Sequence, residues 1–385
     1  MQMVSVGPVI GGPEKLGAEL RAAARSMSRP QLVLLYLPID ADHEAFVAAA
    51  AQATGLQVVG ATTGGAAFTE RGWTRKDAVA AVLGGDDARF EIAVARGLQG
   101  SDLHAVIEAG RSLTARAAGA PSQAPWVLTL ADAFACDGEA LLDALRRSTP
   151  PHWRHIGGTA GDDWAFEQTK IFAQGEVLTG AAVFVGILAQ SPPSLAARHG
   201  WAPAEGGNVF LVTSIDGNLL RTLDDRPAAE VYAEELRRLG LMADDDELLQ
   251  AMATHELGAR TSFGTDLKIR APLAIRDDGT VVLASTLEQG TAVRVMTAEP
   301  EGLIAAAGEL VEHAIGRLET RARGAMIFDC AARLQLLGDR YGEQIGAFVG
   351  HATFPVVGMA CYGEIAKFGG SLEGFHNTTA AIAVW

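Results

Sequence analysis

Hydrophobic residues follow two alternating patterns along the first 150 residues. Continuous apolar runs, such as residues 31–38 and the segment PWVLTLA, predict buried strands, because a strand inside a sheet is covered on both faces. Apolar residues at helical spacing predict helices over 13–28, 101–118 and 137–147, and Asp40 is the expected cap of a further helix. This alternation predicts a mixed α/β domain.

The second half of the chain is richer in strand-like patterns. Such segments, joined by glycine turns, follow one another over 164–214 and lead into a helix over 227–239 that opens with proline. A long amphipathic helix over 300–320 precedes the strand AMIFDC, a further helix and three closing strands. We expect an α/β (mixed α+β) fold in which two units of mixed, largely antiparallel sheets are covered by helices. The expected domains are residues 1–235 and 236–385.

The composition and charge of the chain exclude some classes of partner and of cellular location. The chain has 385 residues, 49% of them hydrophobic, and carries a net charge of −15. No cluster of cations offsets this charge, so a nucleic acid is not an expected partner. The three cysteines are odd in number and far apart, which favours a reducing compartment. The N-terminus lacks the pattern of a signal peptide and the longest apolar run is short, so we expect a cytoplasmic protein without membrane insertion.

A short motif recurs in the sequence. Residues 59–64 and 156–161 share the form apolar-Gly-x-Thr-x-Gly, and residues 357–363 are a looser echo. Glycine permits a close approach of the backbone that a Cβ atom would block. We predict that the first two motifs lie at comparable strand ends, each leading into another strand. Asp162 and Asp163 follow the second motif, where they would repel a phosphate, and we expect them to cap or brace the next segment.

Several short segments occur together in an order that is informative. VVGATTGG, HIGGTAGDD, HGWAPAEGG, FDCAAR, VGMACYGEI and FHNTTAAIAV follow one another along nearly the whole chain. In this combination the sequence resembles the tandem FIST_N and FIST_C domain family, the F-box and intracellular signal transduction proteins. The resemblance implies a sensory module of bacterial signal transduction that binds a small molecule. One branch of the family, the NosP-type nitric oxide sensors, binds haem and acts on a partner histidine kinase.

Signatures of catalysis are absent from the sequence. It contains no HExxH, CxxC, GxSxG or GxxxxGK[ST] motif, and no CxxCH for covalent attachment of haem. We therefore do not expect an enzyme.

Haem b held without a covalent bond needs an axial ligand such as imidazole and an apolar slot. His376, in the segment HNTT, is the first candidate for the haem iron. Its alternative role is a hydrogen bond that orients Glu364. His199 and His351 are the other candidate ligands.

The C-terminal segments also supply a candidate ligand pocket. Cys330 and Arg333 match the Cys-x-x-Arg pattern of the family, and the planar guanidinium of Arg333 suits a ligand carboxylate. Glu364 and His376 flank strands that we expect to pair, which would bring these two residues and Asn377 together with Arg333 at one cavity. We place Arg333 on the adjoining strand. The expected pocket residues are Arg333, Glu364, Asn377, Cys330 and Tyr362.

Three functions remain open from the sequence. The first is a haem-based nitric oxide sensor that regulates a histidine kinase. The second is a haem-free sensor of an amino acid or related metabolite, which would use the same pocket. The third is a redox switch or enzyme centred on Cys330. The sequence leaves the oligomeric state open, including a homo-oligomer.

Overall fold

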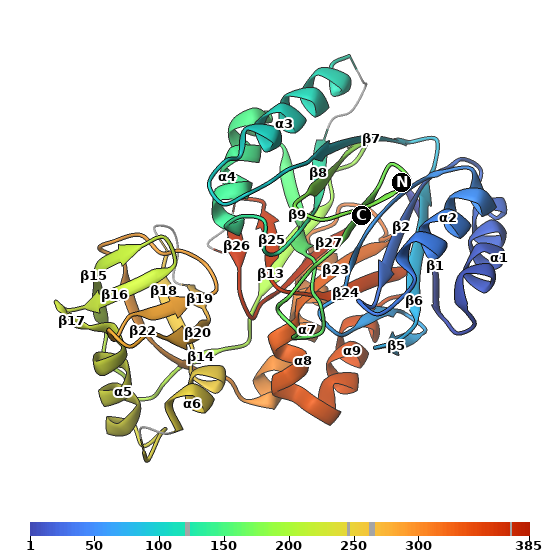
Figure 1. Ribbon diagram of the computed structural model, residues 1–385. Helices are drawn as coiled ribbons and strands as arrows, with labels where there is room; N and C mark the ends of the chain where they lie inside the picture. Colours follow the sequence, from blue (N-terminus) through green and yellow to red (C-terminus); the bar gives the residue numbers. More distant parts are fainter. Residues whose placement is uncertain (120–123, 245–246, 262–265, 370–371) are drawn as a thin grey trace.

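The computed structural model describes residues 1–119, 124–244, 247–261, 266–369 and 372–385. A large body and a smaller lobe stand side by side (Figure 1). Three repeats of one chain path build the body. Each repeat runs as a strand, a helical segment, a strand, a second helical segment, a strand, a hairpin and a returning strand. The predicted mixed α/β fold, with mixed sheets covered by helices, is confirmed.

The repeats follow one another along the chain. The first comprises β1 (Gln2–Val9), α1 (Gly12–Arg25), β2 (Pro30–Leu37), α2 (His43–Thr54), β3 (Gln57–Thr62), the hairpin β4 (Ala67–Thr69) and β5 (Gly72–Thr74), and β6 (Ala78–Gly84). The second comprises β7 (Ala88–Ala95), α3 (His104–Ala117), β8 (Ala124–Ala131), α4 (Gly138–Ser148), β9 (Arg154–Thr159), the hairpin β10 (Ile171–Ala173) and β11 (Glu176–Leu178), and β12 (Ala182–Ala189). The third comprises β13 (Ser194–Arg198), α7 (Pro300–Gly316), β23 (Ala325–Cys330), α8 (Ala331–Leu337), η2 (Gly338–Arg340), α9 (Tyr341–Val349), β24 (Val356–Cys361), the hairpin β25 (Glu364–Lys367) and β26 (Gly374–His376), and β27 (Ala380–Val384).

Each repeat places a parallel strand pair at the centre of its own six-stranded sheet. The pairs are β2–β3, β8–β9 and β23–β24. The returning strand and the first strand extend each sheet on one side, and the hairpin of another repeat completes the other side. The resulting orders are β1-β6-β2-β3-β10-β11, β7-β12-β8-β9-β25-β26 and β13-β27-β23-β24-β4-β5. Because each hairpin crosses to a neighbouring sheet, the three repeats form one body around a shared apolar core.

The recurring glycine motifs meet where the central strands end. The backbone N–H of Gly64 donates to Ala360 O at 2.7 Å, that of Gly161 to Thr62 O at 3.0 Å, and that of Tyr362 to Thr159 O at 3.3 Å. In each bond the donor is the sixth residue of one motif and the acceptor is the fourth residue of another. The three bonds therefore link the three motifs in a ring. A Cβ atom on Gly161 would lie 2.4 Å from the Cα of Gly64, which explains the glycine. The predicted placement at comparable strand ends, β3 and β9, is confirmed.

The lobe is an insertion in the third repeat, between β13 and α7. It contains β14 (Ala202–Pro203), β15 (Phe210–Asp216), β16 (Leu219–Leu223), β17 (Arg226–Pro227), α5 (Ala228–Arg238), α6 (Leu248–Thr254), β18 (Leu257–Arg260), β19 (Leu267–Arg270), β20 (Pro272–Ile275), β21 (Val281–Leu283) and β22 (Ala292–Thr297). Its strands form one sheet with its own apolar core. Strands from both sides of residue 235 pair in this sheet, as β16 and β21 do. The expected boundary at 235 and 236 falls inside α5, and the division into two domains stays a prediction.

Two local expectations differ from the structure. The cap of α2 is Asp42, whose side chain accepts a bond from Ala45 N at 3.1 Å, rather than Asp40. The strand β23 ends at Cys330, and the following AARLQLL forms the short helix α8, in keeping with its strong helix formers. Arg333 therefore lies on a helix and not on the expected strand.

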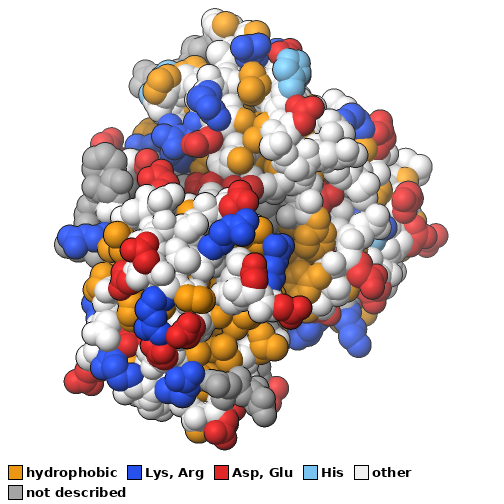
Figure 2. All heavy atoms as spheres, turned by 60° about the vertical axis from the view of Figure 1, so that its left-hand side comes forward, with side chains coloured by type: hydrophobic (Ala, Val, Ile, Leu, Met, Phe, Trp, Pro, Cys, Tyr) orange, Lys and Arg blue, Asp and Glu red, His pale blue; other side chains and the backbone are white. Residues whose placement is uncertain are grey.

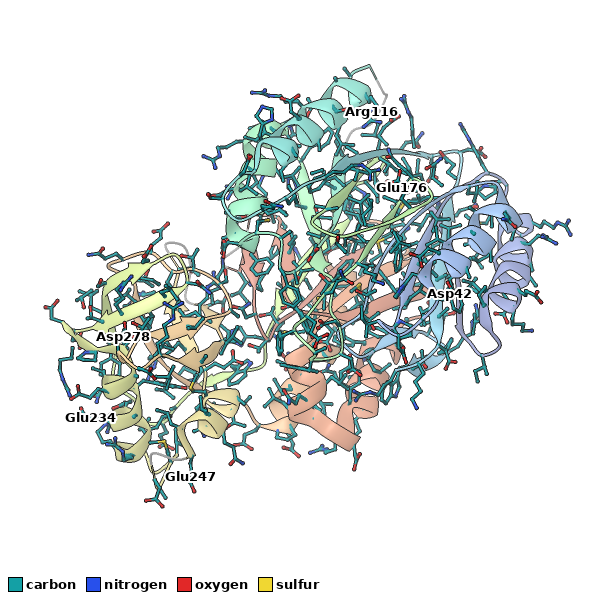
Figure 3. The ribbon with its side chains drawn as sticks, in the orientation of Figure 1. Asp42, Arg116, Glu176, Glu234, Glu247 and Asp278 are labelled. Carbon is teal, nitrogen blue, oxygen red and sulfur yellow. The ribbon has the colours of Figure 1, made fainter. Side chains whose placement is uncertain are left out.

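The outer surface reflects the acidic composition. Figure 3 labels Glu234, Glu247 and Asp278 on the lobe, and Asp42 and Glu176 on the body. Among the described residues, no helix combines the length and the apolar character needed to cross a membrane.

Candidate functional site

A cleft separates the lobe from the body and consists of two adjoining hollows of about 210 and 590 Å³. Residues of both parts line the two hollows together: Trp164, Phe166, Ala271, Leu273 and Ala332. Half of the large hydrophobic side chains that are exposed in the described chain lie here, namely Phe134, Phe166, Leu249 and Leu273. In Figure 2, hydrophobic side chains gather in the hollow beside the lobe. Exposed apolar surface in a concave region is typical of a ligand site.

Four aromatic rings from the body form one wall of this cleft, and we call them the aromatic wall: Phe134, Trp164, Phe166 and Tyr362. The rings of Phe166 and Tyr362 stack with centroids 5.2 Å apart. Trp164 meets Phe166 edge to face at 5.5 Å. Phe134 and Phe166 are 46% and 50% exposed, so their surfaces remain available to a ligand.

The buried carboxylate of Asp162 fixes the loop that carries two of these rings. It accepts hydrogen bonds from three consecutive backbone N–H groups, residues 166–168, at 2.7–3.1 Å and from the hydroxyl of Tyr362 at 2.5 Å. Burial raises the pKa of Asp162, but these bonds outweigh burial and hold it below its usual range. Trp164 (φ 70°) and Phe166 (φ 53°) adopt left-handed conformations, each costing on the order of 1–3 kcal/mol. The predicted bracing role of Asp162 is confirmed.

The segment between β26 and β27 carries polar groups into the cleft. Asn377 is 1% exposed and lines the smaller hollow. Its Nδ2 donates to His376 O at 3.2 Å, which fixes the amide orientation, and its Oδ1 has no hydrogen-bond partner in the described chain. Leaving a buried acceptor unpaired costs about 1–3 kcal/mol. A ligand donor in the hollow would satisfy this oxygen.

Two fully buried carboxyl groups hold this segment from opposite sides. Glu256 of the lobe accepts a hydrogen bond from Thr378 Oγ1 at 2.8 Å, and burial raises its pKa to about 8. Glu364 of the body accepts bonds from Cys361 Sγ at 3.3 Å and from Thr379 N at 3.2 Å. Burial raises the pKa of Glu364 well above its usual range. Both carboxyls are therefore held in the neutral form near pH 7.

Three of the predicted pocket residues, Cys330, Tyr362 and Asn377, line the smaller hollow. Glu364 lies beside this segment and faces His376 across the β25–β26 pair, on the same side of the sheet. Burial, and then the charge of Glu364, raises the pKa of the Cys330 thiol well above its usual range. This thiol is therefore not activated for nucleophilic chemistry.

Arg333 is not among the residues that line the cleft. Its side chain is fully buried between α7 and α9. It donates to Gln344 Oε1 at 2.7 and 3.0 Å, to His199 O at 2.5 Å and to Leu303 O at 2.8 Å. Its Nε also lies 3.0 Å from Asp329 Oδ1, which forms an ion pair. The structure thus gives Arg333 internal partners in place of a ligand carboxylate.

The three candidate haem ligands lie in different settings. His376 is buried, both its ring nitrogens lack a partner in the described chain, and burial followed by the charges of Lys268 and Arg270 lowers its pKa well below the usual range. His199 accepts a bond from Trp201 N at 2.9 Å, and burial lowers its pKa to about 4. His351 is half exposed and lies 3.3 Å from Glu312. None of the three lines the cleft.

A partly buried ion cluster joins the lobe to the body next to the cleft. Glu139, on α4, lies 2.6 Å from Lys268 Nζ and 2.8 Å from Arg270 on β19. Its second oxygen accepts a bond from Phe375 N at 3.3 Å. Because one carboxylate binds two cations of the lobe, it sets the lobe position against α4.

Sequence reasoning did not single out Trp164, Phe166 or Glu256. The first two follow the motif GGTAGDD, but only the left-handed turn aims them into the cleft. Glu256 lies in a charged segment that has the pattern of a solvated helix, and its burial depends on tertiary contact with Thr378.

Comparison with known proteins agrees with this architecture. The family model of the FIST N domain matches residues 31–226, and that of the FIST C domain matches residues 228–367. The chain belongs to the FIST family. FIST domains are sensory domains of signal transduction that bind small ligands. The strand ends that meet beneath the cleft include segments from both domains.

Two mycobacterial relatives share part of the FIST chain. They are Uncharacterized protein Mb0898c of Mycobacterium bovis and Uncharacterized protein MT0897 of Mycobacterium tuberculosis. Each is 25% identical over 244 residues, which is 60% of this chain and 60% of the relative. The match therefore spans less than two thirds of either relative.

Metal binding has no support in the described part of this FIST protein. No group of three or more His, Cys, Asp or Glu side chains there could hold a metal ion. A single axial histidine on a haem iron would not form such a group.

Proposed function

We propose that this FIST protein is a cytoplasmic sensor that binds a small ligand in the cleft between body and lobe and signals through a change in the lobe position. The observation that carries the proposal is the buried, unpartnered Oδ1 of Asn377, a residue that lines the largely apolar smaller hollow. The Glu139 cluster supplies a link to the lobe, because Glu139 bonds to Phe375 of β26, the strand that leads directly into the segment with Asn377.

A thermal-shift screen with amino acids, amines, alcohols and carboxylates tests this proposal. Asn377→Leu removes the acceptor at similar size, and we expect at least a tenfold loss of affinity for any ligand that the screen finds, measured by calorimetry. Leu273→Trp should block the cleft, whereas Leu211→Trp makes the same change at a similarly exposed leucine of the lobe outside it. Equal affinity in all three variants would place the ligand elsewhere and contradict the proposal.

Haem-based sensing of nitric oxide, with a histidine kinase as the partner, is the second candidate. The observation in its favour is His376, a buried neutral imidazole whose nitrogens are unpartnered in the described chain. The donor suits haem iron, but neither hollow of the cleft includes His376 among its lining residues.

Titration with haemin distinguishes the two candidates. If haem binds through His376, a Soret band should appear and be lost in His376→Ala, whereas it should persist in His351→Ala. Absence of a Soret band in the unmodified protein would exclude the haem candidate and leave the cleft proposal intact.

A further inference from the structure

We infer that the ligand of the cleft is an organic cation, a protonated amine attached to an apolar body. This inference rests on the proposed function and names the ligand class of the same site. Three independent features of the cleft support it: its charge, its aromatic wall and its free acceptor.

No cation lines the described part of the cleft. Asp137 lines the smaller hollow, the neutral carboxyl of Glu256 lines the larger one, and neither hollow includes a lysine or arginine among its described lining residues. A carboxylate or phosphate bound here would lose its hydration without a cation to replace it. The described lining residues place no positive charge beside a bound ammonium group.

The nearby cations are already engaged by other groups. Lys268 and Arg270 share the carboxylate of Glu139. Arg333 is enclosed between α7 and α9. An anionic ligand would therefore have to break an existing ion pair before a cation could neutralise it. An organic cation has no such requirement.

The aromatic wall presents ring surface to the cleft. The negative face of an aromatic ring attracts a cation, most strongly where water is excluded. Four rings within one wall, joined by centroid distances of 5.2–6.4 Å, provide several such surfaces. The same surfaces pack against an apolar body, so both parts of the ligand are accommodated.

Asn377 supplies the directional contact. Because its Nδ2 donates to His376 O, the group left free is the carbonyl oxygen, an acceptor. An N–H of an amine matches it, whereas a carboxylate has only acceptors. The polar group fixed in the smaller hollow is therefore complementary to a donor.

Calorimetry with three probes of similar body tests the inference: 2-phenylethylamine, 2-phenylethanol and 3-phenylpropionate. We expect the amine to bind at least tenfold tighter than the alcohol, and the carboxylate weakest. Asn377→Asp should tighten amine binding several-fold, because a bound ammonium group favours the ionised form of the new carboxyl at unchanged size. Phe166→Leu should weaken the amine more than the alcohol, and Trp73→Leu, which alters an exposed ring outside the cleft, should change neither.

The outcomes separate this inference from the proposed function. If the carboxylate or the alcohol binds tightest and Leu273→Trp abolishes that binding, the cleft is a ligand site and the cation assignment is wrong. If the amine binds equally well to Leu273→Trp, or does not bind at millimolar concentration, the inference is overturned. The thermal-shift screen then decides whether the cleft binds any ligand.

Discussion

Arg333→Met is expected to lower the free energy of unfolding by about 3–5 kcal/mol, as breaking one partner of a buried ion pair does. The substitution leaves the carboxylate of Asp329 without its cation in a fully buried position. It also frees two backbone carbonyls, those of His199 and Leu303, which accept from the guanidinium. Urea denaturation at pH 7 measures the effect.

The double variant Asp329→Asn/Arg333→Met is the matched control. Asparagine removes the stranded charge and keeps an oxygen for Tyr341 and Gln344, which donate to Asp329 at 2.9 and 2.7 Å. The double variant should be more stable than Arg333→Met alone. If Arg333→Met instead unfolds like the unmodified protein while losing its ligand, the guanidinium binds the ligand as the sequence first indicated.

The three repeats show which features of the fold can be predicted from the sequence. The motifs at 59–64 and 156–161 predict equivalent strand ends, and the structure confirms them. The looser echo at 357–363 proves to be the third member of the same ring, although Tyr362 occupies the position of a glycine. Of the four residues predicted to meet at one cavity, Glu364, His376, Asn377 and Arg333, only Asn377 lines the smaller hollow, together with Cys330 and Tyr362 of the predicted pocket set.

Other features depend on contacts that a single sequence does not display. A hairpin such as β4–β5 has the same local pattern whether it extends its own sheet or that of another repeat. The lobe interrupts the third repeat between β13 and α7. The sequence therefore does not show that β13 and the strands after α7 belong to the same repeat. The predicted position of Arg333 was wrong because strand β23 ends at Cys330 and helix α8 follows, which turns the guanidinium away from the cleft.

Glu256→Gln is expected to stabilise the protein at pH 8 and to do so much less at pH 5. The unmodified carboxyl has a pKa of about 8 in the folded state, against a usual value of 4.5, because it is fully buried with one hydrogen bond from Thr378. The folded protein therefore holds this proton more tightly than the unfolded chain does. The resulting stability is present below about pH 4.5 and is lost as the pH rises to about 8, by up to about 5 kcal/mol.

Urea denaturation between pH 5 and pH 8 measures this loss. Glutamine cannot ionise and still offers Thr378 an acceptor, so the contribution of this group to the pH dependence should disappear. A slope of the same sign should remain, because burial also raises the pKa of Asp329, to about 6, and that of Glu364. Glu247→Gln, an exposed carboxyl of the same lobe (Figure 3), should keep the slope of the unmodified protein. If Glu256→Gln also keeps that slope, Glu256 is already ionised in the folded protein, and the contact between lobe and body contains a charge that the structure leaves without a cation.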